Sequence, residues 1–366
     1  MIKENSDIDY FKQIEQEFYN FRKTIDLTKD ISPINLKEEK SRFIECLNKG
    51  QVTNPIFKYE KTENINKIGV LQKFRDKFEM LNHSFSKFYI KKINREIDWI
   101  INFGKRDVNF EEWLSFLYGM PSNNEIESAK CLIKEVCPII DDAIPRFSPT
   151  CVKKKLEDVI INHYGFHNWD IVIESMVAKM AVNHLRRKIR INENVQFTEN
   201  EINRLIIHEI GTHVLRGENG QKQYYLLFQY GFPDYLETEE GLAIYSEEKN
   251  NLRRDSDIMK YCIRLLACDL CHKMSFSDLF QYINQYFDID TSFDVSVRIK
   301  RGLIDTSEFG GYTKDQVYYN GYLKVRELSK DILKKLYIGK VGISDLDFLS
   351  SRNITIQEYL IPDWVK

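Results

Sequence analysis

The sequence predicts a mostly helical α+β protein, in which a short mixed sheet lies over two central helices and a helical region precedes them. Apolar residues recur every three or four positions along most of the chain, whereas polar and apolar residues alternate in residues 188–197. With 366 residues, 43% of them hydrophobic, the chain is long enough for two domains. The proline-bounded segment 138–149 predicts a boundary between an N-terminal helical region (1–148) and a second domain (149–366).

The N-terminal region shows helical periodicity. Residues 7–23 and 68–93 carry apolar and aromatic side chains at helical spacing, and Pro33 and Pro55 mark the loops at 29–35 and 52–57. A further helix is expected to follow the loop at 121–124 and to end near residue 136. Amphipathic helices of this kind usually pack together, so we expect a helical layer with a charged outer face.

Composition excludes several classes of protein. Lys and Arg total 53 against 55 Asp and Glu, so no basic surplus indicates a nucleic-acid partner. The acidic start lacks the apolar core of a secretory signal, and no apolar run approaches the roughly 18–20 residues of a membrane span. The seven cysteines are scattered through the chain, which is typical of free thiols rather than of a disulfide framework. We therefore expect a cytoplasmic protein without a membrane partner, of bacterial origin given its Lys, Asn and Ile content; the oligomeric state stays open.

One helix in the second domain has a recognisable start. Thr198 with Glu201 three residues later forms a capping box, which predicts a helix from residue 199. Apolar positions continue the periodicity as far as Leu215. Arg216 suits the negative end of the helix dipole and Gly217 a left-handed stop, so we expect the helix to end there.

This helix carries the segment His208-Glu209-Ile210-Gly211-Thr212-His213. Two His on one helix, with a Glu beside the first, are typical of zinc hydrolases, in which the imidazoles hold the metal and the Glu activates water. Five-residue spacing, however, separates the imidazoles by about 140° on a regular α-helix. A π-type bulge would return them to one face, and Gly211 tolerates unusual backbone angles.

The third ligand is expected from Thr238-Glu239-Glu240-Gly241-Leu242-Ala243, where Thr238 can cap a second helix. Two His plus a Glu from the next helix is the ligand set of the gluzincin peptidases. From their chemistry alone, either Glu239 or Glu240 could be the third ligand.

Three blocks together resemble the tyrosine carboxypeptidase (MATCAP-like) family, whose animal members detyrosinate tubulin and whose bacterial members carry a Gln-Glu-Gly-Leu-Ala motif. These blocks are the His-Glu-Ile-Gly-Thr-His segment, Glu-Glu-Gly-Leu-Ala, and the stretches at 298–305 and 310–321 with Arg-Gly, Thr-Lys-Asp and Tyr-Tyr-Asn-Gly. The resemblance covers roughly residues 150–340, and the N-terminal third carries no matching motif.

The resemblance implies a gluzincin-like zinc metallopeptidase domain at 149–366 that removes a C-terminal residue, such as Tyr or Phe, from a peptide or protein. It implies Zn²⁺ as cofactor, His208, His213 and Glu240 as ligands, and Glu209 as general base. Glu239 stands where many bacterial relatives have Gln, so it remains the alternative to Glu240. The competing functions are a zinc endo- or aminopeptidase and a zinc-binding regulatory protein with little turnover.

The remaining roles have several candidates each. An oxyanion donor is needed beside the metal, and Tyr318, Tyr319 or Tyr245 could supply it. A substrate carboxylate needs a cation, for which Arg298, Arg301 and Lys314 are the candidates. The strand at 190–197 could pair with the substrate backbone.

Two other patterns carry less weight. Cys268-Asp269-Leu270-Cys271-His272 fits the c-type haem attachment pattern, but that chemistry needs export. His163 and His167 could share a helical face, but Gly165 between them disfavours a helix, so packing is the expected role.

Overall fold

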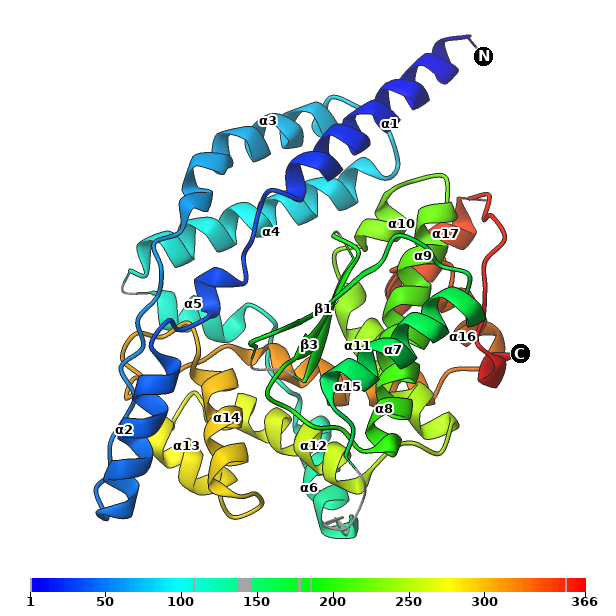
Figure 1. Cartoon of the computed structure of the whole chain (residues 1–366). Coiled ribbons are helices and arrows are strands. Elements are labelled where there is room, and N and C mark those ends of the chain that lie inside the picture. Colours follow the sequence, from blue (N-terminus) through cyan, green and yellow to red (C-terminus); the bar gives the residue numbers. More distant parts are fainter. Residues whose placement is uncertain (1, 108, 137–145, 177–178, 185, 353) are drawn as a thin grey trace.

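The protein is mostly helical with one small sheet, as the computed structural model shows (Figure 1). It describes residues 2–107, 109–136, 146–176, 179–184, 186–352 and 354–366. The predicted α+β class is confirmed. Among the described residues, no helix combines the length and apolarity that a membrane span requires.

The N-terminal layer is built from α1 (Ile2–Arg22), α3 (Ile68–Glu79) and α4 (Ser86–Lys105), which pack side by side in Figure 1. Their shared face is aromatic: the rings of Phe78 and Tyr89 stack with centroids 4.4 Å apart. The helical periodicity of residues 68–93 thus belongs to two helices, α3 and the first part of α4. They are separated by a polar turn in which His83 Nδ1 accepts the backbone N–H of Phe85.

Three shorter helices complete this half of the chain: α2 (Leu36–Asn48), α5 (Phe110–Phe116) and α6 (Asn123–Glu135). The last confirms the helix expected after residue 124, and a capping box between Ser122 and Glu125 starts it. The boundary expected at 148/149 stays a prediction, and most of the segment that suggested it (137–145) lies outside the described residues. The largest hydrophobic core cluster contains residues from both sides of this expected boundary. For example, Phe18 of α1 packs edge-on against Tyr230.

The sheet has three strands, β1 (Asp170–Glu174), β2 (Met180–Asn183) and β3 (Lys188–Asn192), in the order β1-β3-β2. β1 pairs with β3 in parallel and β2 pairs with β3 antiparallel, so the short mixed sheet is confirmed. The expectation that the strand at 190–197 offers an edge to substrate is wrong. Its regular part ends at Asn192, and hydrogen bonds to β1 and β2 occupy both of its sides.

The helix expected from residue 199 does begin there, with the Thr198–Glu201 capping box in place. It runs through α8 (Glu199–Leu205), η4 (Ile206–Val214) and α9 (Leu215–Lys222), so the predicted stop at Gly217 is wrong. A Cβ on Gly217 would overlap the ring of His184. This glycine therefore serves close packing rather than helix termination.

The remaining helices lie before and after this central helix in the chain. Besides α7 (Pro149–Asp158), which packs on the sheet, they are α10 (Leu227–Tyr230), α11 (Tyr235–Lys249), α12 (Asp255–Leu270), α13 (Phe276–Ile283), α14 (Ile289–Lys300), α15 (Gln316–Arg326), α16 (Lys330–Leu336) and α17 (Leu346–Ser351). α11 contacts both η4 and α15. Thr238 does not cap α11, which begins three residues earlier; its hydroxyl accepts the backbone N–H of Ile343 instead.

The structure also places the segment 268–272 and the pair of His163 and His167. Cys268 and Cys271 are fully buried on and after α12, and His272 Nε2 lies 2.7 Å from the sulfur of Met120. His163 ends a short π-helix (η3, Val159–His163) and His167 lies beyond it, so the two share no regular helix.

Candidate metal centre

The segment with both histidines is a π-helix over its whole length, η4 (Ile206–Val214). In a π-helix each residue lies over the one five positions away, because the hydrogen bonds run from i to i+5. The predicted π-type distortion is confirmed, and it directs His208 and His213 to one face. The π-helix does not require a glycine at position 211, since the φ of Gly211 is not positive and a Cβ there would make only ordinary contacts.

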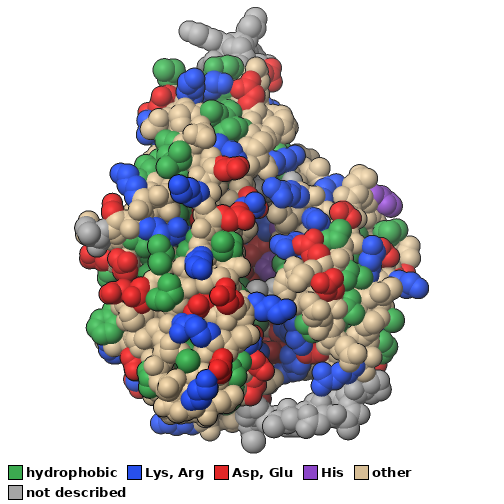
Figure 2. All heavy atoms as spheres, turned by 60° about the vertical axis from the view of Figure 1, so that its left-hand side comes forward, with side chains coloured by type: hydrophobic (Ala, Val, Ile, Leu, Met, Phe, Trp, Pro, Cys, Tyr) green, Lys and Arg blue, Asp and Glu red, His purple; other side chains and the backbone are tan. Residues whose placement is uncertain are grey.

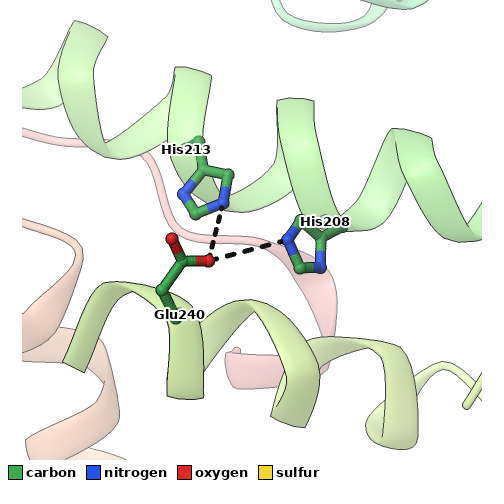
Figure 3. Close-up of side chains that lie close together, drawn as sticks. All are labelled: His208, His213 and Glu240. Atoms are coloured by element: carbon green, nitrogen blue, oxygen red, sulfur yellow. Dashed lines mark ion pairs between the residues drawn. The ribbon is translucent and has the colours of Figure 1, made fainter. Parts of the chain in front are cut away.

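Glu240, on α11, faces the two imidazoles (Figure 3). Its Oε2 lies 4.0 Å from Nε2 of His208 and 3.7 Å from Nε2 of His213, and the three ligand atoms lie within 4.8 Å of one another. Two atoms that each bind one zinc ion at about 2.0–2.2 Å can be at most about 4.4 Å apart. The two nitrogen–oxygen separations therefore fit a common zinc ion.

His208 is held from behind by Glu247, two turns after Glu240 on the same helix. Glu247 is fully buried, and its Oε1 lies 2.6 Å from Nδ1 of His208 and 2.9 Å from a guanidinium nitrogen of Arg204. Burial opposes the charged imidazole, but the hydrogen bond and charge of Glu247 outweigh it and raise the pKa of His208 to about 9. This bond leaves Nε2 as the nitrogen that faces Glu240.

His213 is held in the same way by Glu239. Nδ1 of His213 lies 2.9 Å from Glu239 Oε1, and Glu239 also accepts from Arg216 and from Lys340 Nζ at 2.7 Å. Burial favours the neutral acid, but the charges of Lys340 and Arg216 hold the pKa of Glu239 well below its usual range. The neighbouring glutamates thus have different positions: Glu240 faces the Nε2 atoms, whereas Glu239 lies behind an imidazole.

A carboxylate behind a ligating histidine fixes the ring orientation and raises its basicity. Both imidazoles have one here, which is the donor arrangement expected of a metal site. Sequence reasoning missed Glu247 and Lys340. Glu247 could have been found, because it lies seven residues, two helical turns, after Glu240 and so on the same face of α11.

Glu209 follows His208 in the π-helix and is half-buried. Its charge helps to raise the pKa of His208, so the two groups are electrostatically coupled. Across the residues that the structure places, its carboxylate makes no hydrogen bond or ion pair. It is therefore available for proton transfer beside the cluster.

The three candidate tyrosines lie in different surroundings. Tyr318 is coupled to the Glu240 carboxylate, and burial together with this charge raises the pKa of its phenol. Its ring stacks on Tyr261 with centroids 5.4 Å apart. Tyr319 instead has its hydroxyl 2.9 Å from Ser128 Oγ, and Tyr245 packs edge-on against Trp364. Of the two neighbouring phenols, Tyr318 rather than Tyr319 responds to the charge of Glu240.

The three candidate cations lie in different surroundings. Arg298 makes a two-pronged pair with the buried Asp315 at 2.5 and 2.8 Å. Arg301 lies over the ring of Tyr312, 4.7 Å from its centroid. Lys314 is half-buried in a 3-10 turn (η5, Thr313–Asp315). The guanidinium of Arg298 is thus already paired with a carboxylate of this chain.

A cleft runs down the face shown in Figure 2, and histidine, acidic and basic side chains are visible within it. β2 is an edge strand of the sheet and packs against η4.

This arrangement defines a candidate metal centre of two imidazoles and one carboxylate in a helical α+β protein. The profile of a family described as microtubule-associated tyrosine carboxypeptidase matches residues 45–364, which is most of the chain. The chain belongs to this family.

Individual relatives are similar over a shorter stretch. Microtubule-associated tyrosine carboxypeptidase 1 of Rattus norvegicus is 34% identical over 169 residues, 44% of this chain and 36% of that protein. The Homo sapiens protein of the same name is 34% identical over 157 residues, 41% of this chain and 33% of that protein. The alignments thus span about a third of the length of the curated relatives.

Proposed function

We propose that this protein is a zinc-dependent carboxypeptidase that hydrolyses the last peptide bond of a peptide or protein. The observation that carries the proposal is the convergence of His208, His213 and Glu240, with a carboxylate behind each imidazole. The relatives named tyrosine carboxypeptidase support the direction of attack, from the C-terminus, and a protein or peptide chain as substrate.

The surrounding residues have distinct roles in this reaction. Zinc, when bound, lowers the pKa of water and polarises the scissile carbonyl. Glu209 accepts the proton of the attacking water and returns it to the leaving amine, for which its unpaired carboxylate is suited. Tyr318, whose phenol responds to the charge of Glu240, donates a hydrogen bond to the developing oxyanion. Glu247 and Glu239 keep the imidazoles oriented.

The test compares short peptides with free and amidated C-termini. We expect release of one residue from the free form, dependence on added zinc, and little cleavage of the amidated form. Cleavage of both forms at equal rates would indicate an endo- or aminopeptidase. Zinc binding without turnover of any peptide would instead support the regulatory alternative.

A further inference from the structure

A cavity of about 260 Å³ lies beside the candidate metal centre. Its walls come from α1, α4, β2, α10 and α11, together with Lys340. Lys340 connects it to the centre, because its ammonium group donates to Glu239, which in turn holds His213. Tyr235, another wall residue, lies five positions before Glu240 on the same helix. The cavity therefore adjoins the cluster on the side of the Glu239 carboxylate.

The charges that line this cavity do not balance. Arg22 pairs with Glu96, and Lys340 pairs with Glu239. Lys92 has no such partner: within the part of the chain that the structure describes, its ammonium group makes no hydrogen bond or ion pair. It lies over the ring of Tyr230, 4.3 Å from the centroid, and 5.9 Å from that of Tyr235. Burial, helped by the charges of Arg22 and Lys340, lowers the pKa of Lys92 to about 7, although the charge of Glu96 opposes this.

Other polar atoms of the cavity wall are also unsatisfied. Both ring nitrogens of His184 and Oε2 of Glu96 are buried and, within the described residues, have no hydrogen-bond partner. Buried polar groups in proteins are normally paired, so a cluster of unpaired ones indicates a place for a ligand. Oε2 of Glu96 needs a hydrogen-bond donor, whereas the ammonium group of Lys92 needs an acceptor, so a fitting ligand carries both.

We propose that this cavity receives the C-terminal residue of the substrate and that Lys92 binds its free α-carboxylate. This inference rests on the proposed carboxypeptidase activity. The volume lies below the roughly 300–1,000 Å³ of pockets for drug-sized ligands, and so suits a single residue. The rings of Tyr230 and Tyr235 favour an apolar or aromatic side chain there. The N-terminal layer, which carries no motif, thereby supplies a residue that recognises substrate.

Of the cations near the centre, Lys92 is best placed for this role. Arg298 is committed to Asp315 and Lys340 to Glu239, so a substrate carboxylate would have to compete with a carboxylate of the protein for either. Among the described residues, Lys92 makes no hydrogen bond or ion pair with a carboxylate, so a substrate carboxylate would displace none there.

The first test is hydrolysis of a free-acid peptide that ends in Phe. Lys92→Met keeps the length of the side chain and removes the charge, and we expect kcat/KM to fall about 10- to 100-fold, mainly through KM. Lys92→Arg should restore part of the loss. Lys87→Met, at an exposed position of the same helix, is the matched control and should leave kcat/KM unchanged. Unchanged kcat/KM in Lys92→Met would overturn the inference.

The second test measures binding without turnover, by calorimetry with N-acetylphenylalanine and its amide. The wild-type protein should bind the acid and not the amide, and Lys92→Met should bind the acid at least about 10-fold more weakly. Equal binding of the acid by both proteins, or none by the wild type, would refute the role of Lys92. If the wild type binds the acid through Lys92 yet cleaves no peptide, the proposed activity fails, and only the binding of a carboxylate by Lys92 stands. Melting temperature and zinc content establish that each variant is folded.

Discussion

Gly241 and Gly321 face each other where α11 crosses α15, and neither position has room for a side chain. A Cβ on Gly241 would overlap the carbonyl carbon of Gly321, and a Cβ on Gly321 would overlap the carbonyl oxygen of Glu237. The two glycines belong to separate motif blocks of the sequence, Glu-Glu-Gly-Leu-Ala and Tyr-Tyr-Asn-Gly. Their contact brings α15, which carries Tyr318, close to Glu240.

Gly241→Ala is expected to lower the free energy of unfolding by about 3 kcal/mol, because the added methyl group meets backbone rather than a movable side chain. Denaturant titration measures this. Gly69→Ala in α3 is the control: a Cβ there meets nothing within 4 Å, so the substitution should stabilise by about 0.5–1 kcal/mol. Equal stability of Gly241→Ala and the wild type would show that the helices can move apart at no cost.

Glu209→Gln should bind zinc as the wild type does, since Glu209 lies outside the cluster of three ligand atoms. Peptide hydrolysis should fall about 100- to 10,000-fold, because the amide cannot take the proton of water. Metal analysis and single-turnover assays measure the two effects. Glu199→Gln, exposed on the first turn of α8, should change neither. Activity retained in Glu209→Gln would remove Glu209 from the proposed role.

Glu247→Gln should weaken zinc binding about 10- to 100-fold, since the neutral amide holds the His208 imidazole less firmly than the carboxylate does. Competition with a chelator of known affinity measures the zinc affinity of the variant. Glu248→Gln serves as the control for a lost ion pair, because Glu248 pairs with Arg253 at 2.6 Å and does not contact a histidine. If both variants bind zinc equally, Glu247 does not support the site.

Glu201 makes stability depend on pH in the acid range. Burial favours its neutral form, but Lys179 at 2.6 Å, the Thr198 N–H and Arg254 outweigh this and lower the pKa to about 2, from 4.5. Since the folded state holds the proton less tightly than the unfolded state, the stabilisation is complete above pH 4.5 and is lost as the pH falls towards 2.

Glu201→Gln should therefore be less stable than the wild type by about 2 kcal/mol at pH 7, and the difference should shrink between pH 4.5 and 2. Unfolding titrations at several pH values test this. Glu199→Gln, whose carboxylate is exposed and 3.5 Å from Lys155, should show no such trend. A difference that does not change with pH would mean that the ion pairs of Glu201 contribute nothing.

Features that depend on neighbouring residues could be predicted from the sequence. The capping box at Thr198, the helical periodicity of residues 7–23 and the π-type distortion between His208 and His213 all follow from short-range spacing, and the structure contains each of them. The predictions that failed concern packing. Gly217 and Thr238 have the right residue types for helix ends, but a contact with His184 and a hydrogen bond from Ile343 determine their roles.

By itself, the sequence determined the candidate ligands and the helix that carries the histidines, because residue type and local spacing are properties of the chain. Only the tertiary structure decided that Glu240 rather than Glu239 faces the imidazoles, that Glu247 lies behind one of them and that Asp315 occupies Arg298. It also placed Lys92, from a region without motifs, in a cavity beside the cluster. Such pairings join residues far apart in the chain, and the packing of whole helices sets them.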